Sequence, residues 1–127
     1  MLTEKFGIFD HMFCSEYTRA VETAAHMNLP ESRFNTEFLI REMDSGLQRG
    51  YEHPLKEYGD ATRPLAAWWV RKGGGSGESM ADLCARLHIF LQQLCDTAAG
   101  LRVLVVCHGQ VLRAFEALLQ VCETCCV

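Results

Sequence analysis

A run of five apolar residues, Val103–Cys107, is the feature that most constrains the fold of this 127-residue chain. The run is uninterrupted and rich in β-branched valine, which is typical of a strand buried on both faces, as in a parallel sheet. His108 and Gly109 follow it, and apolar residues then recur at helical spacing from Val111 to Leu119. The segment therefore predicts a buried strand, a turn and a helix.

A second strand–turn–helix segment lies near the start of the chain. Met12–Cys14 form a short apolar strand, and apolar residues then recur at helical spacing between Tyr17 and Ala24. Ser15 is expected to cap this helix, because its hydroxyl can accept a hydrogen bond from a free backbone amide of the first turn. Pro30 cannot continue the helix and marks the latest point at which it ends.

The middle of the chain is less regular. Residues Phe34–Ile40 alternate imperfectly between apolar and polar side chains and predict a further strand. Arg41–Ser76 has no sustained period and predicts a long loop with one or two short helices, of the kind that forms functional lids. Gly73–Gly77 is interpreted as a flexible linker. A phosphate-binding P-loop would need lysine where Glu78 stands, so that interpretation is rejected.

The clearest helix of the sequence follows these glycines. Ser79 and Asp82 have the spacing of a capping box, in which each side chain bonds the other residue's backbone amide. Apolar residues then hold one helical stripe from Met80 to Cys95, and Gly100 ends the helix. The order of helix, buried strand, turn and helix predicts an α/β fold with a mostly parallel sheet.

Composition limits the class of protein. The length corresponds to one domain over residues 1–127. Sixteen acidic and 12 basic residues give a net charge of -4, which argues against nucleic acid as a partner. No apolar run reaches the roughly 18 residues of a membrane span, and the first nine residues lack the apolar segment of a secretion signal. We therefore expect a cytoplasmic protein with its seven cysteines reduced.

Neither kind of cysteine-based site fits the sequence. Cys122, Cys125 and Cys126 are three thiols without a nearby histidine, whereas a structural zinc ion takes four ligands in one place. A cysteine phosphatase would need five residues between Cys14 and Arg19, but the sequence has four and no glycine to curve the loop. No metal or organic cofactor is predicted.

The two strand-to-helix turns are the expected site of chemistry. In open α/β sheets, ligands bind outside the carboxyl ends of the strands. One such turn carries Ser15 and leads to Arg19, and the other carries His108 and Gly109. Free backbone amides at a helix start favour an anion, and the planar fork of arginine suits phosphate oxygens. The sequence therefore predicts an anion pocket that contains Arg19 and His108.

Four stretches, in order along the chain, resemble motifs of the histidine phosphatase superfamily, in its phosphoglycerate mutase-like branch. Residues 13–24 are similar to its motif of serine, arginine–alanine and threonine–alanine, and residues 39–46 to its acid-bearing loop. Residues 77–83 resemble its Gly-Glu-Ser helix start, and residues 103–114 its final strand, histidine and helix. Each stretch alone is weak, but four in the family's order are specific.

The resemblance implies a three-layer α/β/α fold and an enzyme that hydrolyses phosphomonoesters or transfers their phosphoryl group. It implies that Arg19, with Ser15 beside it, binds the phosphoryl group. His108 would bond the same oxygens and stabilise the charge that develops on them. Glu42 would be the general acid that protonates the leaving oxygen. The ligand would be a small phosphorylated substrate or inorganic phosphate.

The sequence departs from the family at one point. The family opens with a strand that ends in arginine–histidine–glycine, whose histidine is the nucleophile, and this motif is absent. We therefore expect an N-terminally truncated domain without the family's first strand, and activity that is impaired or lost. The alternative is a non-catalytic module that binds a phosphorylated ligand or a protein. Strand edges left bare would favour association between copies or instability.

Overall fold

The computed structural model describes residues 7–29, 34–47, 66 and 68–125, with side chains up to residue 120 in the last helix. Three strands form one sheet in the order β2-β1-β3. These strands are β1 (His11–Cys14), β2 (Phe34–Thr36) and β3 (Val103–Val106). Both outer strands run parallel to β1, so the predicted parallel α/β architecture is confirmed.

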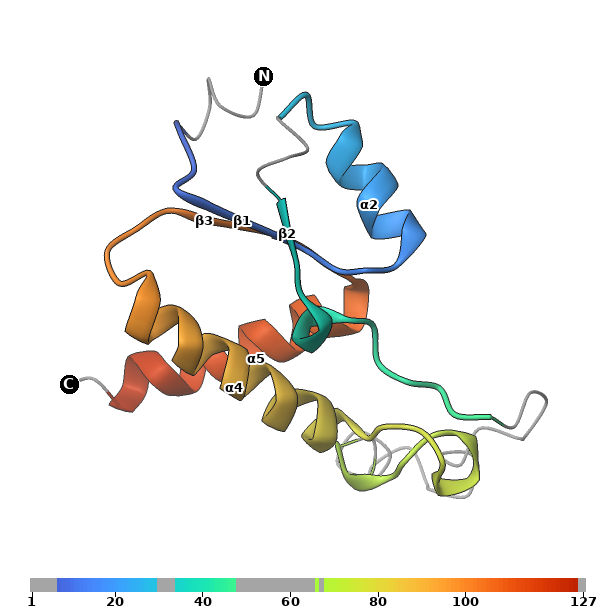
Figure 1. Cartoon of the computed structure of the whole chain (residues 1–127). Helices are drawn as coiled ribbons and strands as arrows, with labels where there is room; N and C mark the ends of the chain where they lie inside the picture. Colours follow the sequence, from blue (N-terminus) through green and yellow to red (C-terminus); the bar gives the residue numbers. More distant parts are fainter. Residues whose placement is uncertain (1–6, 30–33, 48–65, 67, 126–127) are drawn as a thin grey trace.

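Helices cover both faces of the sheet. Figure 1 shows α2 (Thr18–Ala25) on one side of the strands, and α4 (Met80–Thr97) and α5 (Gly109–Cys125) together on the other. This is the expected three-layer α/β/α arrangement. No helix in the described part of the chain is long and apolar enough to cross a membrane.

The two helical layers bury very different side chains. Alternate strand residues face opposite sides, so Phe13 packs toward α4 and α5 while its neighbour Cys14 packs toward α2. The side of α4 and α5 has a core of mostly large residues: Ile40, Met43, Leu83, Leu87, Phe90, Val111 and Ala114. The side of α2 has a core of small ones: Cys14, Ala20, Ala24 and Val106. Small side chains let α2 lie close against the ends of β1 and β3.

The start of α4 forms the predicted capping box. The Ser79 hydroxyl accepts from the Asp82 amide at 3.2 Å, and the Asp82 carboxylate accepts from the Ser79 amide at 3.0 Å. A hydrogen bond from Arg71, together with those from Ser79, lowers the pKa of the Asp82 carboxyl to about 2. The carboxylate therefore stays charged near the positive end of the helix dipole, where a negative charge is stabilising.

Two strand predictions need correction. The strand expected over Phe34–Ile40 ends at Thr36, because the Glu37 carboxylate accepts from the Leu39 amide at 2.8 Å and begins a 3₁₀ turn, η2 (Phe38–Ile40). The strand expected to be buried on both faces is instead an edge strand of the described sheet, and only Val106 of β3 is fully buried. The valines of β3 favour an extended strand, and they do not require that both faces of the strand be buried.

The long loop is described only at its two ends. Residues 48–65 and 67, on which most of the predicted lid falls, lie outside the described residues. Its glycine-rich end is a packed turn, η4 (Gly73–Gly75), so the linker interpretation is wrong. A Cβ atom at Gly77 would lie 2.6 Å from the Asp44 carbonyl oxygen, and one at Gly73 would lie 2.6 Å from the Ser45 oxygen. These glycines are therefore required for close contact with the segment after Glu42.

Candidate phosphate-binding site

The site lies where β1 and β3 end side by side. Register pairs Cys14 with Val106, so the turns that follow the two strands start at the same level of the sheet. The Ser15 amide donates to the Val106 carbonyl at 3.0 Å and extends this pairing by one residue. Ser15 is fully buried, and His108 is nearly so. Parallel pairing thus brings together two residues that are 93 positions apart in the sequence.

A chain of hydrogen bonds joins the predicted residues. Arg19 Nε donates to His108 Nδ1 at 3.2 Å, and His108 Nε2 lies 2.8 Å from the Ser15 hydroxyl. Because Nδ1 accepts, a neutral His108 carries its proton on Nε2 and donates it to Ser15. The Ser15 hydroxyl in turn donates to the Glu16 carboxylate at 3.3 Å. The arrangement fixes both the tautomer and the ring orientation of His108.

The environment of His108 keeps its imidazole neutral. Burial lowers its pKa below the usual value, and the positive charge of Arg19 lowers it further. The negative charges of Glu42 and Glu16 act in the opposite direction without reversing the shift. A neutral donor beside an arginine is suited to bind an anion. In a serine hydrolase, one ring nitrogen of the histidine donates to a carboxylate and the other accepts the proton of the serine. Here an arginine instead of a carboxylate faces Nδ1 of His108.

The helix after Ser15 begins differently from the prediction. The N-cap residue of α2 is Tyr17, and no side chain caps its first turn. The Ser15 hydroxyl accepts from the Tyr17 amide, which precedes the helix, at 3.4 Å and faces His108. Ser15 therefore takes part in the polar chain of the site instead of capping the helix.

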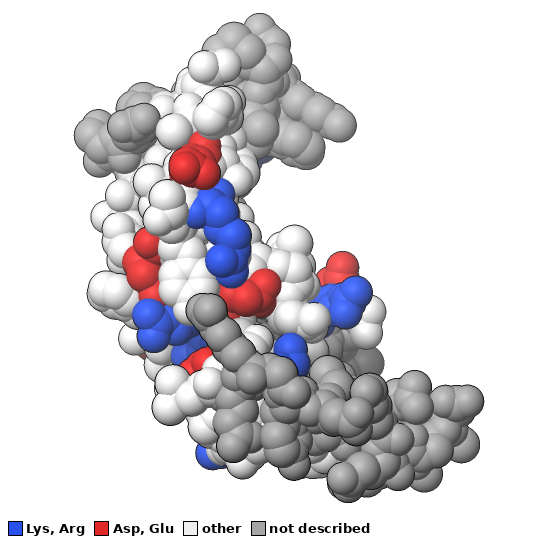
Figure 2. Space-filling model, turned by 90° about the vertical axis from the view of Figure 1, so that its right-hand side faces the viewer, with Lys and Arg blue, Asp and Glu red and all other residues white. Residues whose placement is uncertain are grey.

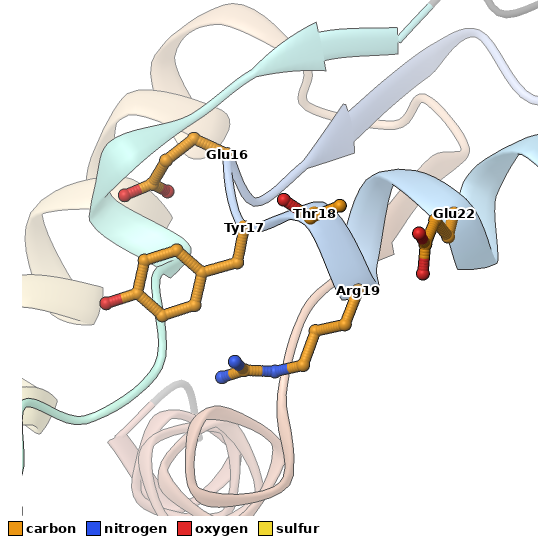
Figure 3. A pocket seen from close by; sticks show the side chains of 5 residues that line it. All are labelled: Glu16, Tyr17, Thr18, Arg19 and Glu22. Carbon is orange, nitrogen blue, oxygen red and sulfur yellow. The ribbon is translucent and has the colours of Figure 1, made fainter.

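A cavity of about 550 Å³ opens beside this turn, lined by Glu16, Tyr17, Thr18, Arg19 and Glu22 (Figure 3). The space is shallow and open to solvent, so it is a surface depression beside the site and not an enclosed pocket. Figure 2 views the molecule from the side on which the strands end and shows basic and acidic side chains next to one another across this face.

Glu42 lies near the site, on the segment that follows η2. Its carboxylate accepts from the Met43 amide at 3.0 Å and is partly buried. The negative charge of Glu42 opposes the lowering of the His108 pKa, so the two groups lie within electrostatic reach of each other. The structure thus joins Arg19 and Ser15 by hydrogen bonds through His108, with Glu42 in a neighbouring position.

Arg86 of α4, which the sequence did not single out, holds the segment that carries Glu42. Its guanidinium donates to the carbonyl oxygens of Leu39 and, at 3.1 Å, of Arg41. It also forms a two-point ion pair with Glu78, at 3.0 and 2.9 Å. The Glu78 carboxylate accepts from the Asp44 amide at 2.9 Å. The only signal for this clamp was the spacing of eight residues between Glu78 and Arg86, which is not specific.

The cysteines support no alternative site within the described residues. Cys14 is buried behind the Ser15 turn, and burial raises the pKa of its thiol, which disfavours a nucleophilic thiolate. Cys95, expected among apolar residues, is exposed, because its side of α4 faces solvent. No group of three or more potential metal ligands occurs in the described part. The side chains of the cysteine tail lie outside the described residues.

Fold and site together define an α/β protein with a hydrogen-bonded cluster of Ser15, Arg19 and His108 at the ends of neighbouring parallel strands. The chain belongs to the histidine phosphatase superfamily (branch 1), whose family model matches residues 4–123. No curated protein sequence matches the chain.

Solved structures with the same phosphoglycerate mutase-like fold agree with this assignment. A mycobacterial glucosyl-3-phosphoglycerate phosphatase in complex with inorganic phosphate superimposes with a TM-score of 0.66 at 22% identity, covering 93% of this chain and 61% of that one. Mycobacterial hydrolase 1 gives 0.63 at 23%, covering 87% and 58%. The product of an open reading frame from Mycobacterium tuberculosis gives 0.60 at 26%, covering 89% and 56%. The chain spans less than two thirds of the length of each.

Proposed function

We propose that this chain binds the phosphoryl group of a small phosphorylated compound, or inorganic phosphate, at the ends of β1 and β3. The observation that carries the proposal is the contact of Arg19 Nε with His108 Nδ1 at 3.2 Å, with Ser15 bonded to the other ring nitrogen at 2.8 Å. In the described part of the chain, the terminal nitrogens of Arg19 have no hydrogen-bond or ion-pair partner. They can therefore receive two oxygens of a phosphate.

The other residues have complementary roles in this proposal. His108 and Ser15 provide neutral donors for the remaining oxygens, at a place where burial strengthens each hydrogen bond. Glu42 is the general acid that protonates the oxygen of the leaving group. The reaction is hydrolysis of a phosphomonoester or transfer of its phosphoryl group.

We further propose that this activity is impaired or lost in the 127-residue chain. The alternative is a non-catalytic module that binds a phosphorylated ligand or a protein. The sequence lacks the arginine–histidine–glycine segment of the family. Of the four described histidines, His11, His26 and His88 lie outside the hydrogen-bonded cluster, and only His108 belongs to it. His108 is already engaged as a donor, so it does not replace the missing nucleophile.

The remaining elements of the proposal concern the setting of the protein. We propose one domain over residues 1–127, in a cytoplasmic protein with reduced thiols that binds neither nucleic acid nor membrane. The exposed edge of β3 is where copies would associate, because its outer backbone groups have no strand partner in the described sheet. Sedimentation of the purified chain over a range of concentrations tests this association.

Hydrolysis of an aryl phosphate is the test of the proposed reaction. Wild type is compared with Arg19→Ala, His108→Ala and Glu42→Gln, and with Arg113→Ala as a control at an exposed position on α5. Turnover that falls about a hundredfold or more in the first three variants, and not in the control, supports an active enzyme with a further nucleophile. Wild-type rates equal to buffer, together with a phosphate-dependent rise in the unfolding temperature, support the binding module. Neither turnover nor phosphate stabilisation would refute both.

A further inference from the structure

Tyr17 occupies a position for which its residue type is unfavourable. It is the N-cap of α2, where serine, threonine, asparagine or aspartate would accept a hydrogen bond from the first turn, and its side chain makes none. The lack of a capping side chain weakens the start of the helix. Residue preferences such as that of the N-cap are commonly violated where the side chain has a role in a functional site.

The ring of Tyr17 is surrounded by the charged groups of the site. The guanidinium carbon of Arg19 lies 4.8 Å from the ring centroid, and that of Arg41 lies 5.7 Å from it. The imidazole of His108 meets the ring at 5.3 Å with an angle of 60° between their planes. Figure 3 shows that the side chain of Tyr17, from the turn, and that of Arg19, from α2, extend to the same side, with the guanidinium beside the ring.

The two arginines differ in how their charge is balanced. Arg41 forms an ion pair with Glu16, donating from Nε at 2.7 Å. Among the described residues, Arg19 has no carboxylate partner, and its side chain is held only by His108 and by the face of Tyr17. An ion pair would fix Arg19 but would neutralise it. An aromatic face attracts a cation and leaves its charge available for a ligand.

We propose that Tyr17 is a positioning residue for Arg19. The ring of Tyr17 holds the guanidinium of Arg19 against His108, so that the terminal nitrogens of Arg19 point to the bound phosphoryl group. This inference rests on the proposed phosphate site. An arginine that is already ordered loses less side-chain entropy when the ligand binds, and the ligand is bound more tightly. A cation–π contact of ordinary strength corresponds to a change of about tenfold in affinity.

The test replaces the ring while keeping its apolar character. Tyr17→Leu and Tyr17→Met remove the aromatic face, and Tyr17→Phe keeps the face without the hydroxyl. Inorganic phosphate is titrated by calorimetry against each folded variant. We expect about tenfold weaker binding for the leucine and methionine variants, and affinity restored to within about twofold in the phenylalanine variant.

A second readout does not depend on phosphate. NMR titration of His108 reports whether Arg19 still lies against its ring. Burial is the main cause of the lowered pKa of His108 and the charge of Arg19 is the second, so loss of the cation raises that pKa toward its usual value in variants that keep an apolar side chain beside the imidazole. We expect that rise in Tyr17→Leu and Tyr17→Met, and none in Tyr17→Phe. If wild type binds no phosphate, the proposed function fails while this titration still decides the role of Tyr17. An unchanged His108 pKa in the leucine and methionine variants, or equal losses in all three, would overturn the inference.

Discussion

The site has two halves that are held in place by different means. The half that we propose to bind phosphate, called the phosphate half, consists of Ser15, Arg19 and His108, which follow the ends of paired strands and are joined by hydrogen bonds through His108. The acid half consists of the segment around Glu42, which Arg86 attaches to α4. Sheet register fixes the first half through backbone pairing, and a side-chain clamp fixes the second. The exposed ion pair of Arg41 with Glu16 links the two halves only weakly. We therefore expect substitutions in one half to leave the other largely intact.

Arg19→Ala is expected to have the largest effect. Two charge-assisted hydrogen bonds to phosphate are lost, so affinity for inorganic phosphate should fall about a hundredfold. The free energy of unfolding should change little, because Arg19 is exposed. Calorimetric titration and urea unfolding measure the two quantities, with Arg113→Ala as the matched control. An equal loss in Arg113→Ala would show that overall charge, not the site, sets the affinity.

Arg86→Ala is expected to show the opposite pattern. The Glu78 carboxylate would stay mostly buried without its partner, and two carbonyl groups would lose their donor. Breaking a fully buried pair costs about 3–5 kcal/mol, and partial exposure reduces this to about 2 kcal/mol. Urea unfolding measures the loss.

Arg71→Ala is the control for this clamp, because it breaks a more exposed pair with Asp82 and should lower the free energy of unfolding less than Arg86→Ala does. Phosphate affinity should stay within about threefold of wild type in Arg86→Ala. A hundredfold loss there would mean that the two halves are not independent.

Gly77→Ala sharpens the comparison at the glycine contacts of the acid half. The new Cβ would lie 2.6 Å from the Asp44 carbonyl oxygen and 2.7 Å from the Gly46 amide, so backbone must move. Overpacking of this kind costs about 1–3 kcal/mol. Gly109→Ala is the matched variant in the phosphate half, where a Cβ meets nothing within 4 Å, and stability should be unchanged or higher. Thermal unfolding of the two variants compares them directly.

The smallest expected effect is the pH dependence due to His108. Its pKa is lower in the folded chain than in the unfolded chain, so the unfolded state binds more protons at mildly acidic pH. The stability that it contributes is complete above the unfolded value, about 6.5, and is lost as the pH falls below that value. Unfolding of wild type and His108→Gln between pH 5 and 8 measures this. The difference in unfolding free energy between them should shrink toward low pH, and a difference that grows instead would contradict the lowered pKa.

Much of the fold followed from local patterns. Helical spacing and the capping box predicted α4, and the two strand–turn–helix segments predicted parallel strands with Arg19 and His108 at their ends. These predictions succeeded because spacing and capping act over a few residues. Sequence alone could not distinguish a valine-rich edge strand from one buried on both faces, because both favour the same β-branched residues.

The sequence by itself determined which chemical groups are available and which turns present them: Ser15 and Arg19 on one, His108 on the other. The tertiary structure decided how those groups meet. In the folded chain, Ser15 bonds to His108 instead of capping the helix, and the ring of Tyr17 packs against Arg19. Arg86 donates to the backbone of the segment that carries Glu42. These contacts join residues from different elements or depend on side-chain direction. Residue type and spacing do not encode them, since packing of the whole chain sets which groups come within a few ångströms of one another.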